Sequence, residues 1–236
     1  DSEQQNPCIS VPAEDKAQCE QMNVWLDQKL VEWKPKEYKP MEFGAYHVQA
    51  SDGIFVKSNA ETDDKMLDVL LETNANIIVL YVRTGSYFSQ KERYDQLINK
   101  IRISGKKLFI GARFDDIKMN FDDYDKALND YTKNIIAELK PDYYGIVLEP
   151  TTMETKYGFD ATDEQWAELS ERIAKLSKQL SPATKTVNDG HKGELNFLQL
   201  SSDLASIDII AFNIYDSNGI YPKYSGYLGK GDLVGN

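Results

Sequence analysis

Short apolar segments alternate with longer amphipathic segments through the chain from about residue 42 onward. The apolar segments are bounded by Gly, Pro or polar residues, a pattern typical of buried parallel strands. They lie at residues 43–48, 76–83, 107–113, 142–152 (apolar centre 145–148), 184–188 and 206–214. Apolar residues recur at helical spacing in the segments between them, which predicts helices at 62–73, 90–103, 124–139, 162–180 and 195–205.

Strands that alternate with helices predict an α/β fold with a parallel sheet and right-handed crossovers. A doubly wound sheet and a (β/α)8 barrel both meet this description. No Gly-x-Gly-x-x-Gly follows the first strand, and no Gly-x-x-x-x-Gly-Lys-Ser/Thr occurs in the chain. The chain therefore lacks the common nucleotide-binding motifs of open sheets, and a TIM-like barrel is favoured over an open six-stranded sheet.

The first part of the chain follows a different pattern. Apolar residues at helical spacing predict a helix from residue 13 to about 33, and Pro35 and Pro40 mark a linker after it. We therefore divide the chain into an N-terminal arm and helix, 1–40, and a barrel domain, 41–236. Cys8 and Cys19 are the only cysteines. They are expected to form a local disulfide, which fits an exported protein, with two free thiols as the alternative.

The first six strand–helix units extend to residue 214, and the chain has 236 residues. Two further units would need about 60 residues, judged from the ~250 residues of a typical barrel. We expect the seventh and eighth units to be absent from this chain, and either to lie in a second polypeptide, to be disordered, or to lie outside this span.

Composition narrows the classes of partner. The net charge is −11, from 27 Lys and Arg against 38 Asp and Glu. A nucleic-acid partner or an anionic membrane surface would need a basic face, so neither is expected. No apolar run approaches the ~18 residues of a membrane span. The chain begins at Asp1 without a signal peptide, and we expect either a removed leader or an internal start, with secretion or cell-surface display.

Polar residues gather where the predicted strands end. In a barrel the carboxyl ends of the strands converge on one rim, where catalytic residues lie. The residues concerned are His47, Gln49, Asp52, Arg83, Arg113, Asp115, Asp116, Glu149, Asn188, Asp189, His191, Asn213, Tyr215 and Asp216.

Three short motifs resemble a known group of enzymes. Leu148-Glu149-Pro150 on the fourth strand is similar to the Asn-Glu-Pro of the retaining glycoside hydrolase clan with (β/α)8 barrels. Phe212-Asn-Ile-Tyr-Asp216 resembles the sixth strand of several of its families, and Arg83 fits the clan's arginine on the second strand. Leu148 departs from the pattern, because the clan has Asn there, whose amide contacts the 2-hydroxyl of the substrate.

The resemblance implies hydrolysis of O-glycosidic bonds in a polysaccharide, with retention. It implies that Glu149 is the acid/base, that Arg83 orients a carboxylate and that Tyr215 lines the sugar site. A Glu on the seventh strand would be the nucleophile, about 5 Å from the acid/base. The other predicted substrate-binding residues are His47, Asp115, Asn188, His191 and Asn213.

Other interpretations of these residues stay open. Glu149 could form a structural ion pair with Arg83 or Arg113. His47 and His191 could pair around a metal, but no segment has the tight spacing of a metal motif, so we predict no metal and no cofactor. A non-catalytic carbohydrate-binding or structural barrel in an extracellular assembly is the alternative function, and a barrel enzyme with a non-sugar substrate is a third.

Overall fold

The computed structural model describes residues 16–17, 20–21, 24, 44–46, 60–114, 118–191 and 193–213. The predicted Cys8–Cys19 disulfide lies outside these residues. Those described between 16 and 24 are helical, within the segment predicted as the N-terminal helix. The division into an arm and a barrel domain stays a prediction.

The six predicted strands form one parallel sheet. They are β1 (Gly44–Tyr46), β2 (Ile77–Arg83), β3 (Lys107–Arg113), β4 (Tyr143–Leu148), β5 (Lys185–Gly190) and β6 (Ile209–Phe212). Their spatial order is the same as their order along the chain. A doubly wound sheet reverses its strand order in the middle, so this order is that of a singly wound, half-barrel arrangement.

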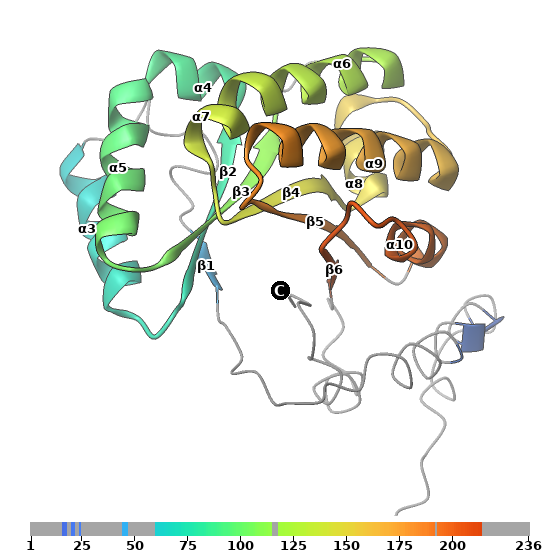
Figure 1. Ribbon diagram of the computed structural model, residues 1–236, viewed down its shortest axis with the longest axis horizontal. Coiled ribbons are helices and arrows are strands. Elements are labelled where there is room, and N and C mark those ends of the chain that lie inside the picture. The colour runs from blue at the N-terminus through green and yellow to red at the C-terminus, as the bar shows by residue number, and fades with distance from the viewer. Residues whose placement is uncertain are drawn as a thin grey trace, which may run out of the picture.

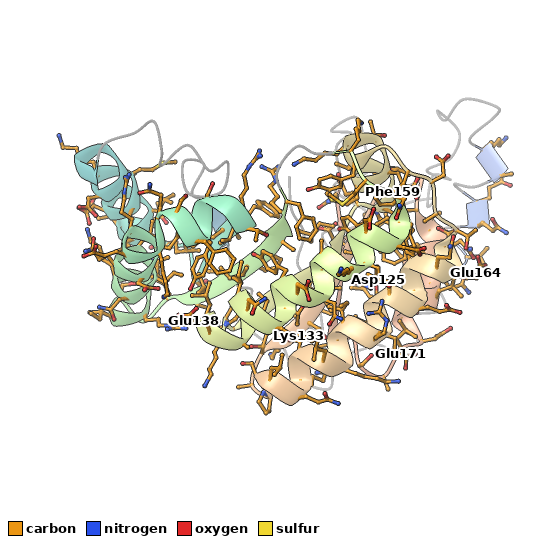
Figure 2. The ribbon with its side chains drawn as sticks, turned by 90° about the horizontal axis from the view of Figure 1, so that it is seen from above. Asp125, Lys133, Glu138, Phe159, Glu164 and Glu171 are labelled. Carbon is orange, nitrogen blue, oxygen red and sulfur yellow. The ribbon has the colours of Figure 1, made fainter. Side chains whose placement is uncertain are left out.

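The helices described from residue 60 onward cover one face of this sheet (Figure 1). They are α3 (Ala60–Glu72), α4 (Thr84–Ser89), α5 (Lys91–Ile103), α6 (Phe121–Tyr131), α7 (Ala137–Leu139), α8 (Pro150–Tyr157), α9 (Asp163–Leu180) and α10 (Leu195–Ser202), with a π-helical turn, η2 (Thr132–Ile136), between α6 and α7. Figure 2 views this outer layer from above, where Lys133, Glu138 and Glu164 are exposed.

Local sequence signals explain several helix ends. The side chain of Thr162 accepts a hydrogen bond from Gln165 N, and Gln165 Oε1 accepts one from Thr162 N, which together form a capping box. Asn120 Oδ1 caps α6 in a similar way by accepting a hydrogen bond from Asp123 N at 2.8 Å. Because of this cap, the helix predicted from residue 124 begins at Phe121.

Two apolar clusters lie on opposite faces of the sheet. The larger cluster packs the strands against the helices and contains buried aromatic residues such as Tyr124, Tyr131, Tyr144 and Trp166. The smaller, inner cluster contains strand residues only: Ile77, Phe109, Tyr143, Leu148, Val187, Ile209 and Ala211. Strand alternation thus assigns each residue near a strand end to the helix side or to the inner side.

Glycine makes room on the inner face. A Cβ atom at Gly111 would lie 2.3 Å from the Tyr81 ring and 2.8 Å from Leu148, and one at Gly145 would lie 2.8 Å from Leu148. Leu148 therefore fills space that two glycines leave open.

One sequence interpretation is wrong. Asn-Asp-Gly at residues 188–190 is a strong local turn signal, and the predicted fifth strand ends at residue 188, but these residues continue β5. Asp189 pairs with Leu148 on one side and Ala211 on the other, so ladders with both neighbouring strands outweigh the local turn preference. Helix α8, directly after Glu149, was not predicted.

Candidate active site at the carboxyl end of the sheet

The carboxyl ends of the strands bring several predicted residues to the inner face. Ile77, Val79 and Tyr81 belong to or pack on the inner cluster, so alternation directs Arg83 to the same side, and Arg113 follows Phe109 and Gly111 in the same way. The guanidinium carbon of Arg113 lies 5.3 Å from the centre of the Tyr81 ring, in a cation–π contact. Two guanidinium groups thus come from neighbouring strands, β2 and β3.

Glu149 lies directly after β4, as predicted. Its carboxylate is held by two side chains: Asn213 Nδ2 donates to Oε1 at 2.8 Å, and Thr152 Oγ1 donates to Oε2 at 2.8 Å. The Glu149 backbone N–H donates to the Asp189 carbonyl at 3.2 Å. The residue remains partly exposed, so its carboxylate is both oriented and accessible.

The backbone of Glu149 is left-handed, with φ 58° and ψ 87°. Such a conformation is unfavourable for a residue with a Cβ atom. It ends β4 and starts α8 within one residue, and Pro150 occupies the first helical position, where its missing N–H costs nothing. The sharp turn therefore fixes where the carboxylate emerges from the sheet.

Asp189 is the second carboxyl group beside Glu149. The residue is 8% exposed. Val187, two residues earlier in β5, and Ala211, its pairing partner on β6, both belong to the inner cluster, so Asp189 faces the inner side as well. Burial raises the pKa of Asp189 well above its usual range, and the negative charges of Glu149 and Glu194 raise it further, while the Glu149 N–H and the Asn213 amide act in the opposite direction.

A hydrogen-bonded chain supports the turn after β4. Glu194, 3% exposed, accepts hydrogen bonds from the N–H and the hydroxyl of Thr151, both at 2.7 Å, and from the His191 N–H at 2.9 Å. His191 Nε2 lies 3.1 Å from Thr151 Oγ1, and His191 Nδ1 accepts from Gly193 N. This assigns the ring proton to Nε2 and ties His191 to the start of α8.

The structure brings together only some of the residues predicted from sequence. Glu149 and Asn213 are in contact, and Arg83 lies on the same face of the sheet, whereas Asn188 is fully buried and donates to Ser201 on α10 at 3.0 Å. His47, Asp115 and Tyr215 lie outside the described residues.

Sequence reasoning missed the roles of Thr152, Asp189 and Glu194. Strand alternation was the available signal for Asp189, because Asn188 and Asp189 are adjacent and only one of them can face inward. Within the described ranges, no group of three or more His, Cys, Asp and Glu side chains is arranged to hold a metal ion. No helix there is long and apolar enough to cross a membrane.

A scan of protein-family models finds no match, and a search of curated protein sequences finds none either. Solved structures do match. A β-glucuronidase from Parabacteroides merdae has a TM-score of 0.57 and 10% identity over 84% of this chain and 24% of that one. A β-glucuronidase from Bacteroides uniformis has a TM-score of 0.57 and 15% identity over 82% and 24%. The fold is glycosidase-like.

A second enzyme from the same organism, β-glucuronidase 3, has a TM-score of 0.55 and 12% identity over 82% of this chain and 24% of that one. The chain thus spans about a quarter of the length of these β-glucuronidases. At such identities the likeness shows the fold, an α/β half-barrel like that of the TIM-barrel glycosidases, and leaves the activity to be argued from the site.

Proposed function

We propose that this protein is a secreted or cell-surface glycoside hydrolase that cleaves O-glycosidic bonds of a polysaccharide with retention, and that Glu149 is its acid/base. One observation carries the proposal: a partly exposed carboxylate after the fourth barrel strand is held by Asn213 and Thr152. Active sites of such barrels lie at this end of the strands. A carboxylate whose two oxygens are oriented separately suits proton transfer in a fixed direction.

In the proposed reaction, protonated Glu149 donates its proton to the glycosidic oxygen as the bond to the anomeric carbon breaks. The leaving sugar departs as an alcohol, and the Glu149 carboxylate then takes a proton from the attacking water. Retention needs a second carboxylate, about 5–5.5 Å from Glu149, which bonds to the anomeric carbon as the leaving sugar departs and is then displaced by the attacking water. We place it outside the described residues, on the seventh strand that the resemblance implies.

The remaining residues are assigned to substrate binding. Arg83 and Arg113 supply positive charge on the inner face, which suits the orientation of a carboxylate or of sugar hydroxyls. Asn213, which already touches Glu149, is close enough to contact a sugar bound there. His47, Asp115 and Tyr215 are proposed to complete the site. The proposed export rests on the expected Cys8–Cys19 disulfide.

The test is Glu149→Gln, which keeps the shape of the side chain and removes its proton chemistry. The wild-type chain is first assayed on a panel of polysaccharides and aryl glycosides, and kcat on any cleaved substrate is then expected to fall about 10²–10⁴-fold in the variant. Glu168→Gln, on the exposed outer side of α9, is the matched control and is expected to keep full activity. Unchanged cleavage by Glu149→Gln would refute the assignment.

A second candidate function is a non-catalytic carbohydrate-binding or structural barrel. Leu148 favours it, because its side chain is packed against the inner-face glycines and offers no amide to a 2-hydroxyl group. The same panel separates the two functions. Binding without turnover, on glycan arrays and by calorimetry, supports the binding protein, whereas released reducing sugar supports the enzyme.

A further inference from the structure

Glu149 and Asp189 come from adjacent strand ends, and their positions are fixed by the sheet. Asp189 pairs with Leu148, so Glu149 follows immediately beyond that pair, and its N–H bonds to the Asp189 carbonyl at 3.2 Å. Asn213, after β6, donates to Glu149 Oε1 at 2.8 Å and also interacts with the Asp189 carboxyl group. Asn213 thus lies beside both carboxyl groups.

The surroundings of Asp189 do not favour its charged form. The side chain is more than nine-tenths buried, and Oδ1 has no hydrogen-bond partner among the described residues. Two acidic groups raise its pKa further: Glu149 from the end of β4 and Glu194 from the turn before α10. Burial next to other carboxylates destabilises the charged form of a carboxyl group much more than its neutral form.

We propose that Asp189 and Glu149 form a carboxyl dyad in which Asp189 keeps its proton near neutral pH, with Asp189 as the positioning residue for the acid/base. Burial and the neighbouring Glu149 charge both disfavour ionisation of Asp189, so its proton leaves only at higher pH. The dyad thereby keeps a proton at the strand ends for the leaving group. The catalytic part of this inference rests on the proposed function, whereas the retained proton of Asp189 does not.

Packing alone does not account for an acidic residue at position 189. An inward carboxyl group on β5 occupies a place where Val187 and Ala211 on the same face are apolar. Asn would fit the same volume without the ionisation cost. A carboxyl group that retains its proton next to Glu149 has a chemical use there that an amide lacks.

The deciding measurement is a carbon-13 NMR titration of the full chain, with labelled Asp and Glu carboxyl carbons and Asp189→Asn to assign the Asp189 signal. We expect Asp189 to be protonated at pH 7 in the wild type. In Glu149→Gln its titration midpoint is expected to move to lower pH, because the neighbouring negative charge is gone. Glu168→Gln, on the outer face, is expected to leave the midpoint unchanged.

An ionised Asp189 at pH 7, or a midpoint that does not move in Glu149→Gln, would overturn the dyad whether or not the protein cleaves glycans. If it does cleave them, Asp189→Asn is expected to shift the alkaline limb of the pH–rate profile to lower pH, because the one-proton dyad no longer exists. An unshifted limb would overturn the positioning role. If only the proposed function is wrong, Asp189 is still protonated at pH 7 and its midpoint still moves in Glu149→Gln, but no substrate is cleaved.

Discussion

The two ends of the parallel sheet hold their acidic residues in opposite ways. At the amino end, Asp142 Oδ2 accepts a hydrogen bond from Leu108 N at 2.8 Å. Asp208 there accepts hydrogen bonds from Thr186 N, the Thr186 hydroxyl and Lys178 Nζ. At the carboxyl end, Asp189 is more deeply buried, has an oxygen without a partner among the described residues and faces two other carboxyl groups.

The pKa values of these groups follow the same division. Partial burial alone would raise the pKa of Asp208, but the hydrogen bonds from Lys178 and Thr186 lower it below the usual range. Burial and nearby negative charge raise the pKa of Asp189. At the amino end, the acidic side chains therefore stabilise the sheet through hydrogen bonds to neighbouring strands. At the carboxyl end, Asp189 is electrostatically unfavourable, which is typical of a functional site.

The largest effect is expected at the amino end. Asp208→Ala leaves the buried Thr186 N–H without its side-chain acceptor, and should lower the free energy of unfolding by about 1–3 kcal/mol at pH 7. A lowered pKa contributes stability above the unfolded-state pKa, and this contribution is lost as pH falls. The loss measured by urea denaturation should therefore shrink below about pH 4.

Asp160→Ala, at an exposed loop position, is the control for that experiment and is expected to change stability little. An equal loss at pH 7 and pH 3 would show that the Asp208 charge does not stabilise the fold.

The opposite sign is expected at the carboxyl end. Because the pKa of Asp189 is raised in the fold, the unfolded chain loses this proton first as pH rises above about 4, and stability falls. Asp189→Asn removes that cost and should raise the free energy of unfolding by about 0.5–2 kcal/mol at pH 7, the usual range for a stabilising substitution. Calorimetry at pH 7 and pH 4 tests this, since the gain should vanish at the lower pH. If Asp189→Asn lowers the free energy of unfolding at both pH 7 and pH 4, Asp189 stabilises the fold and the contrast between the two sheet ends is wrong.

The smallest effect is expected from Lys178→Met. Lys178 Nζ lies 2.7 Å from Asp208 Oδ2, but both side chains are about one-third exposed, at 33% and 32%. A pair of this kind contributes about 0.2–1 kcal/mol and is screened by salt. Denaturation with and without 0.5 M salt (about a 4–5 Å Debye length) measures it. A loss as large as that of Asp208→Ala would assign the stabilisation to the ion pair instead of to the Thr186 hydrogen bonds.

Much of the sheet could be predicted from sequence because its strands are apolar on both faces. The pattern predicts residues 107–113 as a strand with the bounds that the structure has, and residues 162–180 as a helix, which the structure begins at Asp163. Helices with strong amphipathic patterns needed only local information. The position of Glu149 after β4 followed from the same pattern.

The partners of Glu149 could not be predicted, because they depend on contacts between distant segments. Asn213 meets Glu149 from 64 positions away, and Glu194 reaches Thr151 from 43 positions away. Asp189 was misplaced because Asn-Asp-Gly is a strong local turn signal, and only pairing with β4 and β6 keeps it extended. Long-range hydrogen bonds, and not local propensity, therefore determine the partners of Glu149 and the extended conformation at Asp189.

The left-handed backbone of Glu149 has an evolutionary consequence. Keeping a residue with a Cβ atom in this conformation costs about 1–2 kcal/mol, which Gly would avoid and Asn would reduce. A lineage released from the need for the carboxylate would thus gain stability by drifting to Gly or Asn at position 149. Among relatives of this chain, the residue at that one position is expected to separate lineages under selection for chemistry from those under selection for folding alone.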